Sequence, residues 1–212
     1  LRMNSEQKFK EGDALRQTFE TTSNAEVMFF TDHCQVYKTR LGEFDDAKAS
    51  VLGDYLPTKL KMDAGENVIF MVLPGPDYTG SLLFFFENGK VARVALSAYQ
   101  TQTRRKKLTG AYSDKSPLAA ACLLTEDTEM AVTSTEGRAV VFHTAALTPK
   151  TTRSTQGVNV MTLKPKYKVA DARPLADTTI VNAARYRARS LPIAGMLLRP
   201  EDRAEEQMTL LE

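Results

Sequence analysis

The sequence has few of the residues and motifs on which catalytic or metal chemistry usually depends. It holds two cysteines, Cys34 and Cys122, which lie too far apart for a local metal knuckle and are too few for a disulfide framework. Its two histidines, His33 and His143, lack a spaced cysteine, histidine or carboxylate partner, so structural roles are predicted for all four residues. Neither a P-loop nor a nucleophile elbow occurs. We therefore expect no catalysis, no metal and no cofactor in this chain.

Long hydrophobic runs are also missing. The longest apolar stretches, such as Ser81 to Phe86, are far too short to cross a bilayer, and the N-terminus has no signal core. The chain of 212 residues is 42% hydrophobic and 25% charged, which suits one sizeable core in a soluble cytoplasmic protein. The first residue is Leu1 rather than methionine, which fits an excised C-terminal piece of a longer protein.

What the sequence does contain is a repeat of roughly fifty residues. Each unit consists of an apolar strand, a tight turn and a second strand, followed by a polar stretch that leads to a glycine. Cys34, Gly89 and Gly137 correspond in the three turns and lie 55 and 48 residues apart. This spacing predicts one four-stranded blade per repeat. A repeated blade presents the same surface several times, which suits a long, regular partner such as DNA.

Local patterns support strands and hairpins. Residues 36 to 41 alternate with a period of two, which predicts a strand with one wet face. The Asn88-Gly89 pair between two apolar runs favours a type I′ turn. Cys34 lacks the freedom of glycine, so the first hairpin is expected to be longer or differently turned. Residues 118–124 and 157–163 are expected to form further strands.

The repeat divides the chain into an all-β series of blades. The expected blades are 26–79, 80–127 and 128–175, and residues 1–25 resemble the end of a preceding blade. Residues 176–212 are expected to hold a closing strand and an acidic C-terminal tail.

Within that last segment, Thr178 to Leu191 is the expected closing strand, with Arg185, Arg187 and Arg189 alternating onto one face. From Pro192 onward the expectation is a loosely packed tail.

Charge is unevenly distributed although the net charge is only +2. Between Lys90 and Gly110 there are six bases and no acid, and between Arg138 and Arg173 there are seven bases and one acid. Such segregation creates a positive face on a nearly neutral molecule. An ordinary solvated surface is the alternative for any one cluster, and recurrence in successive repeats favours a binding surface.

Two segments carry a resemblance to a known family. Val27 to Asp32 and Thr151 to Lys164 resemble blades of the C-terminal domain of the gyrase A protein, from bacterial DNA gyrase, and of its paralogue in topoisomerase IV. The resemblance spans about residues 8 to 175 and implies a β-pinwheel. This is a propeller-like disc of four-stranded blades that exchange strands and bend DNA around a basic rim. About three full repeats plus a partial or composite blade are expected here.

The resemblance also implies function and partners. The chain would bind and bend or wrap double-stranded DNA, and in the intact enzyme it would accompany an N-terminal breakage-reunion domain and a separate ATPase subunit. The strand-cleaving tyrosine of that family lies in the breakage domain, so this chain alone would not be catalytic within an ATP-dependent DNA isomerase of the bacterial cytoplasm and nucleoid. The heptapeptide Gln-Arg-Arg-Gly-Gly-Lys-Gly, which marks gyrase, does not occur, and both gyrase and topoisomerase IV remain open.

The family's loop of an arginine leading to a glycine is matched by Arg153 and Gly157, and more loosely by Arg104 to Lys107 with Gly110. Lysines and arginines on successive blades would contact phosphates along a curved path rather than read bases. The predicted DNA contacts are Lys38, Arg40, Lys90, Arg93, Arg104, Arg105, Lys106, Lys107, Arg138, Lys150 and Arg153. Gly89, Gly137 and Gly157 are expected to shape the backbone only. A β-propeller-like protein–protein interaction module is the alternative function, and a basic rim would distinguish the two.

Overall fold

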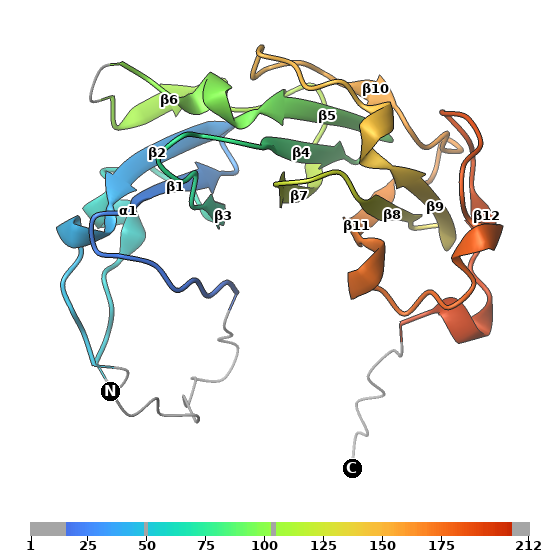
Figure 1. Cartoon of the computed structure of the whole chain (residues 1–212), viewed down its shortest axis with the longest axis horizontal. Helices are drawn as coiled ribbons and strands as arrows, with labels where there is room; N and C mark the ends of the chain where they lie inside the picture. The colour runs from blue at the N-terminus through green and yellow to red at the C-terminus, as the bar shows by residue number, and fades with distance from the viewer. Residues whose placement is uncertain (1–15, 49–50, 103–104, 205–212) are drawn as a thin grey trace. The chain divides into compact units, whose positions relative to one another are not determined.

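The computed structural model describes residues 16–48, 51–102 and 105–204. It is nearly all β, as expected, and contains three four-stranded antiparallel sheets (Figure 1). In spatial order, sheet A consists of β3 (Val68–Val72), β1 (Glu26–Thr31), β2 (Gln35–Arg40) and β6 (Lys107–Thr109). Sheet B consists of β10 (Val158–Asn159), β5 (Lys90–Ala95), β4 (Ser81–Phe86) and β7 (Leu118–Leu124). Sheet C consists of β11 (Val169–Pro174), β8 (Glu129–Ser134), β9 (Arg138–His143) and β12 (Met196–Leu197).

Helical structure is confined to short pieces. The one α-helix among the described residues is α1 (Leu56–Lys59), and the 3₁₀ turns are η1 (Leu41–Glu43), η2 (Leu96–Tyr99), η3 (Thr144–Ala146), η4 (Leu175–Asp177), η5 (Ala183–Arg185) and η6 (Pro200–Asp202). In each sheet a 3₁₀ turn, η1, η2 or η3, directly follows the second strand of the hairpin. Over the described residues, no helix is both long and apolar enough to cross a membrane.

The chain forms two compact units. The first unit comprises residues 1–78 and 99–111 and contains sheet A. The second comprises residues 79–98 and 112–212 and contains sheets B and C.

All three hairpins turn in the same way. Each has three residues between its strands, and the third one adopts a positive φ: 54° at Cys34, 87° at Gly89 and 82° at Gly137. The expectation of a longer first hairpin is therefore wrong, because Cys34 accepts the left-handed conformation that glycine supplies in the other two. The expected type I′ turn is also wrong, because Asn88 is not among the positive-φ residues; a three-residue loop with a left-handed third residue forms instead.

Each sheet takes its fourth strand from chain beyond its own repeat. Strand β6 follows β5 in the sequence yet pairs with β2, and β10 follows β9 yet pairs with β5. The expected blades 26–79, 80–127 and 128–175 thus each contribute three strands to one sheet. The blade boundaries themselves stay a prediction.

Glycine marks the entry to two of the exchanged strands. A Cβ at Gly157 would lie 2.1 Å from the Val91 carbonyl oxygen, and one at Gly195 would lie 2.5 Å from the Ala139 carbonyl oxygen. In sheet A the corresponding residue is Lys107, which pairs with Tyr37 of β2. Lys107, rather than Gly110, is therefore the counterpart of Gly157, because strand register and not the nearest glycine defines the repeat.

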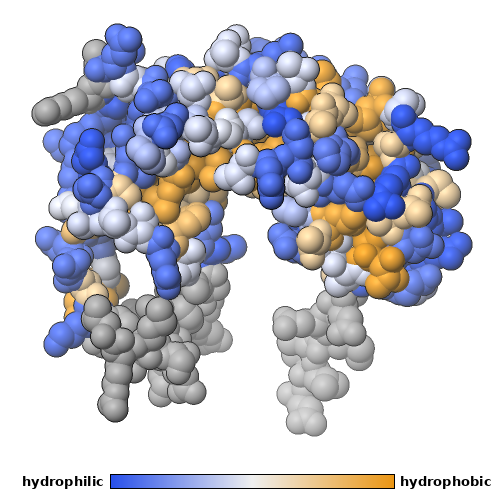
Figure 2. All heavy atoms as spheres, viewed as in Figure 1, coloured by the Kyte–Doolittle hydropathy of each residue, from blue (hydrophilic) through white to orange (hydrophobic). Residues whose placement is uncertain are grey.

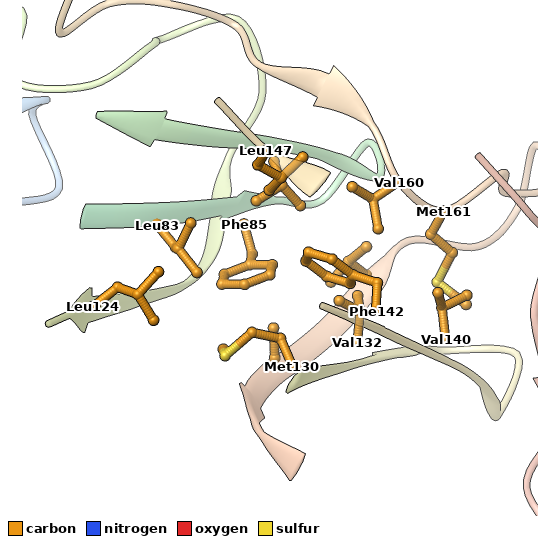
Figure 3. Packing of buried hydrophobic residues seen from close by; sticks show 13 residues of the cluster. Leu83, Phe85, Leu124, Met130, Val132, Val140, Phe142, Leu147, Val160 and Met161 are labelled. Carbon is orange, nitrogen blue, oxygen red and sulfur yellow. The ribbon is translucent and has the colours of Figure 1, made fainter. Parts of the chain in front are cut away.

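The second unit has its core between sheets B and C (Figure 3). Leu83 and Phe85 point from one side of β4 toward Met130 and Val132 of β8, as the two-residue period of strands requires. The rings of Phe85 and Phe142 lie 6.5 Å apart and tilted by 55°. Because both sheets supply these fully buried side chains, the two blades of this unit stabilise each other.

In the first unit, both faces of β2 are covered. Every residue from Gln35 to Thr39 is buried, and only Arg40 is exposed. The expectation of one wet face is wrong, because Tyr37 packs with Val27 and Phe29 on one side while Val36 and Lys38 are buried on the other. Alternation alone does not distinguish a half-exposed strand from a fully covered one when a lysine occupies one of the alternating positions.

The end of the described chain also departs from expectation. The closing strand of sheet C is β12, so the placement of that strand within Thr178 to Leu191 is wrong. The described residues after Pro192 are held in place rather than loosely packed. The Asp202 side chain is 2% exposed and accepts hydrogen bonds from the Tyr186 hydroxyl at 2.5 Å and the Val181 amide at 2.8 Å. An acidic composition does not reveal that one of the acids caps a buried loop.

Candidate nucleic-acid interface

In every sheet the chain passes the far end of the second hairpin strand before it enters the fourth strand. These passages are residues 101–102 and 105–106 beside β2, 150–156 beside β5 and 187–194 beside β9, and we call them basic loops A, B and C. Lys150 forms a bridge to Val94, and Arg187 forms one to Val141. The Lys106 carbonyl accepts a hydrogen bond from the Lys38 amide at 2.7 Å. The three loops therefore occupy corresponding places in the three sheets.

Each basic loop carries exposed cations. Arg105 in loop A, Lys150 in loop B and Arg189 in loop C are exposed, and within the described ranges their side chains form no hydrogen bond or ion pair. Lys106 is 72% exposed and lies 3.1 Å from Glu43. The hydrogen bond from Lys106 lowers the pKa of the Glu43 carboxyl. Figure 2 shows hydrophilic residues on the visible face, with hydrophobic residues exposed between them.

Basic loop A also borders an open groove in the first unit with a volume of about 460 Å³. Arg40, Arg105 and Lys106 line it, and the acids Glu26 and Glu43 lie within the same lining. The exposed Arg40 donates to the Asn24 carbonyl at 3.1 Å. In the second unit a groove of about 420 Å³ is lined by η3, β10 and residues 188–191 of basic loop C.

Two of the predicted contacts are instead buried and bonded within the fold. The Lys38 side chain is 8% exposed and its ammonium donates to the Tyr99 carbonyl at 2.9 Å. The Arg93 side chain is 13% exposed and its guanidinium lies 2.8 Å from Asp127. Their burial leaves little surface for a DNA phosphate, so we leave Lys38 and Arg93 out of the interface.

Four more of the predicted DNA contacts are side chains that already form bonds within the fold or are half-buried. Lys107 pairs with Asp63 at 2.8 Å, and this hydrogen bond raises the pKa of the Lys107 ammonium. The Arg138 guanidinium donates to the Gly195 carbonyl at 3.0 Å, and that of Arg153 donates to the Ala98 carbonyl at 3.0 Å. The half-buried Lys90 lies 3.5 Å from a side-chain oxygen of Gln156. Arg104 lies outside the described residues.

The glycines serve two different needs. Gly89 and Gly157 have positive φ and also lie against backbone, since a Cβ on either would come 2.1 Å from a carbonyl oxygen. A Cβ on Gly137 would meet no atom within 4 Å, so only its φ of 82° requires glycine.

Sequence reasoning does not find basic loop C. The alternation of Arg187 and Arg189 predicts a closing strand, yet these residues lie in the loop beside β9 that corresponds to the loop of Lys150 beside β5. Arg187 makes a bidentate ion pair with Glu129 at 2.9 and 3.0 Å, and these hydrogen bonds raise the pKa of Arg187. Arg189 is left exposed beside it. The alternating arginines are the available signal, and only the sheet register shows that they belong to the recurring loop.

Parts of the second and third repeats match a known protein family. Residues 81–107 and 129–176 match the family described as DNA gyrase C-terminal domain, beta-propeller. This match confirms the resemblance to the gyrase A C-terminal domain. The two matched segments contain the hairpins of sheets B and C, including both Gly turns. No curated protein sequence matches the chain.

Solved structures show the same fold. The C-terminal domain of DNA topoisomerase IV is 21% identical with a TM-score of 0.71, and the match covers 82% of this chain and 55% of that one. The gyrase A C-terminal domain is 15% identical with a TM-score of 0.58, covering 83% of this chain and 60% of that one. The ParC C-terminal domain from E. coli is 14% identical with a TM-score of 0.68, covering 91% and 84%. The chain thus spans little more than half of the first two structures.

Proposed function

We propose that this chain is a non-catalytic DNA-binding domain that bends or wraps DNA as part of the DNA-cleaving subunit of an ATP-dependent type IIA topoisomerase. It presents a duplex to the breakage-reunion domain for strand passage, and the separate ATPase subunit completes the enzyme. The observation that carries the proposal is the recurrence of an exposed cation, Arg105, Lys150 or Arg189, in the loop that leads to the fourth strand of three successive sheets. The family match and the β-pinwheel fold support the same function.

Recurrence matters because a bent duplex must be held at several points. Bending a short duplex by 40 to 90° costs on the order of 1 to 6 kcal/mol, and one phosphate contact does not offset this. Lysine and arginine side chains release condensed counterions when they reach phosphates, and they carry no base-specific information there. We therefore expect strong salt dependence and low sequence specificity.

The direct test is the salt dependence of binding to a short duplex. The variant Lys150→Glu with Arg189→Glu changes two exposed cations of the second unit. We expect its affinity to fall strongly and its log–log salt slope to flatten by roughly 0.9 for each lost phosphate contact. The matched control is Lys115→Glu with Arg173→Glu, whose side chains are 67% and 56% exposed outside the basic loops. Equal losses in both variants would show a general charge effect and contradict the proposed interface.

A linking-number assay then separates the two enzymes. The chain is bound to nicked plasmid at low salt, the nick is ligated, and the topoisomers are resolved after the protein is removed. A shift that grows with protein indicates chiral wrapping, as in the gyrase alternative, whereas retardation without a shift indicates the bending surface of a topoisomerase IV. An absence of any DNA binding would favour the protein-interaction module instead.

A further inference from the structure

Lys38 and Arg93 occupy the same position in two successive hairpins. Each lies on the second strand, four residues after the left-handed turn residue, Cys34 in sheet A and Gly89 in sheet B. Each side chain is nearly buried, at 8% and 13% exposure. A cation at one recurring buried place calls for a structural explanation, because removing a charge from water is costly unless it is paired and hydrogen-bonded.

Lys38 contacts both ends of basic loop A. Its ammonium donates to the Tyr99 carbonyl at 2.9 Å and lies 3.4 Å from the Thr101 hydroxyl, where the loop begins. Its main-chain amide donates to the Lys106 carbonyl at 2.7 Å, where the loop ends. One residue of β2 thus fixes the loop on both sides of the exposed Arg105.

Arg93 contacts the corresponding segment beside sheet B, which leads into basic loop B. Its guanidinium donates to the carbonyls of Thr144 at 2.9 Å and Leu147 at 3.1 Å, just before basic loop B. Its own carbonyl accepts from the Lys150 amide at 2.8 Å. The exposed Lys150 side chain therefore starts from a backbone that Arg93 holds.

Carboxylates neutralise both buried cations. The Lys38 ammonium lies 3.2 Å from Glu26, and the Arg93 guanidinium lies 2.8 Å from Asp127. In sheet C the equivalent residue is Val141, and the anchoring cation comes from the loop itself, as Arg187 on Glu129. We propose that Lys38 and Arg93 are positioning residues that hold basic loops A and B for DNA without touching DNA. The inference rests on the proposed DNA-binding function of the loops.

Replacing the buried cations by methionine should separate positioning from contact. In Lys38→Met and Arg93→Met the loop loses its side-chain anchor and must be ordered when DNA binds, which lowers the affinity about tenfold. The log–log salt slope stays at the wild-type value, because Arg105 and Lys150 still reach phosphates. A contact residue behaves differently: Lys150→Met should lower the slope by roughly 0.9.

Two further variants complete the experiment. Arg173→Met removes an exposed cation from β11, outside the loops, and so measures the effect of one lost charge. Arg93→Lys keeps the buried charge with fewer donors and should recover part of the affinity lost in Arg93→Met. Amide hydrogen exchange gives a readout without DNA. Protection at Lys150 should fall in Arg93→Met, while protection in β8 and β9 should stay unchanged.

Each outcome of these measurements either supports the inference or overturns it. A slope lowered by roughly 0.9 in Lys38→Met or Arg93→Met would make them contact residues and overturn the inference. Unchanged affinity in both would overturn it as well. If Arg93→Met does not fold, Asp127→Asn replaces it, because Asp127 is the ion-pair partner of Arg93 and its side chain is 42% exposed. The same affinity and salt slope are then measured. If the wild type does not bind DNA, the proposed function fails, and the exchange at Lys150 still tests the anchor by itself.

Discussion

The requirement for glycine at the entry to an exchanged strand leads to a quantitative prediction. In Gly157→Ala the new Cβ would lie 2.1 Å from the Val91 carbonyl oxygen and 2.6 Å from the Ala92 nitrogen, at a φ of 77°. The left-handed conformation costs about 1–2 kcal/mol for a residue with a Cβ. The steric conflict adds about 1–3 kcal/mol, because the partner atoms are backbone and do not rotate away. We therefore expect a loss of about 2–5 kcal/mol of unfolding free energy.

Gly137→Ala is the matched control. Its φ of 82° is similar, but its Cβ meets no atom within 4 Å, so only the conformational cost of about 1–2 kcal/mol applies. Urea unfolding followed by circular dichroism compares the two midpoints. A clearly larger loss at Gly157 supports the close approach of β10 to β5. Equal losses would refute the reasoning, because the steric contribution would then be absent.

Three further predictions concern stability. Phe142→Ala should lower the unfolding free energy by about 3–5 kcal/mol in a urea titration, because the ring is 4% exposed in the core of the second unit, whereas Leu52→Ala, at 92% exposure, should change it by less than about 0.5 kcal/mol. Cys34→Gly should leave stability within about 1 kcal/mol of the wild type, since glycine adopts the φ of 54° without strain but loses chain entropy; a larger loss would show that the thiol has a structural role. The hydrogen bond from Tyr186 lowers the pKa of Asp202, so its stabilisation is present above the ordinary carboxyl pKa and is lost as pH falls through the lowered value. In Asp202→Asn the unfolding midpoint should change less with pH below about 4 than in the wild type; parallel pH profiles would contradict this.

The strands and their repeat are accessible from sequence, but the exchange between sheets is not. Strand β7 coincides with the expected 118–124, because an apolar run bounded by turns has few alternatives. Only two residues of the expected strand 157–163 pair with β5, since the next two leave the ladder at the Gly89 turn, where the Val160 and Met161 amides donate to the Gly89 carbonyl at 3.0 and 3.2 Å. This pairing joins strands that are far apart in the sequence, so a local sequence pattern does not predict it.

The residues of the candidate interface are likewise only partly predictable from the sequence. Arg105 and Lys150 are predicted contacts and are exposed, whereas Arg189 is not predicted although it is exposed in the corresponding loop of sheet C. Lys38 and Arg93 are predicted contacts that the fold buries. A count of bases along the chain treats all five alike, because their charge is the same and only their solvent exposure differs.

The first residue of each hairpin explains why some of these cations are buried. Glu26, Ser81 and Glu129 open β1, β4 and β8, and each accepts a hydrogen bond or ion pair from a cation: Lys38, Arg93 and Arg187 respectively. In sheets A and B the cation is on the second strand, whereas in sheet C it belongs to the basic loop, because Val141 takes the strand position. An acceptor at the head of a hairpin therefore pairs with one cation in each blade, and this cation is nearly buried in sheets A and B and exposed in sheet C. The exposed cations that remain in the loops are those that the fold leaves accessible to solvent.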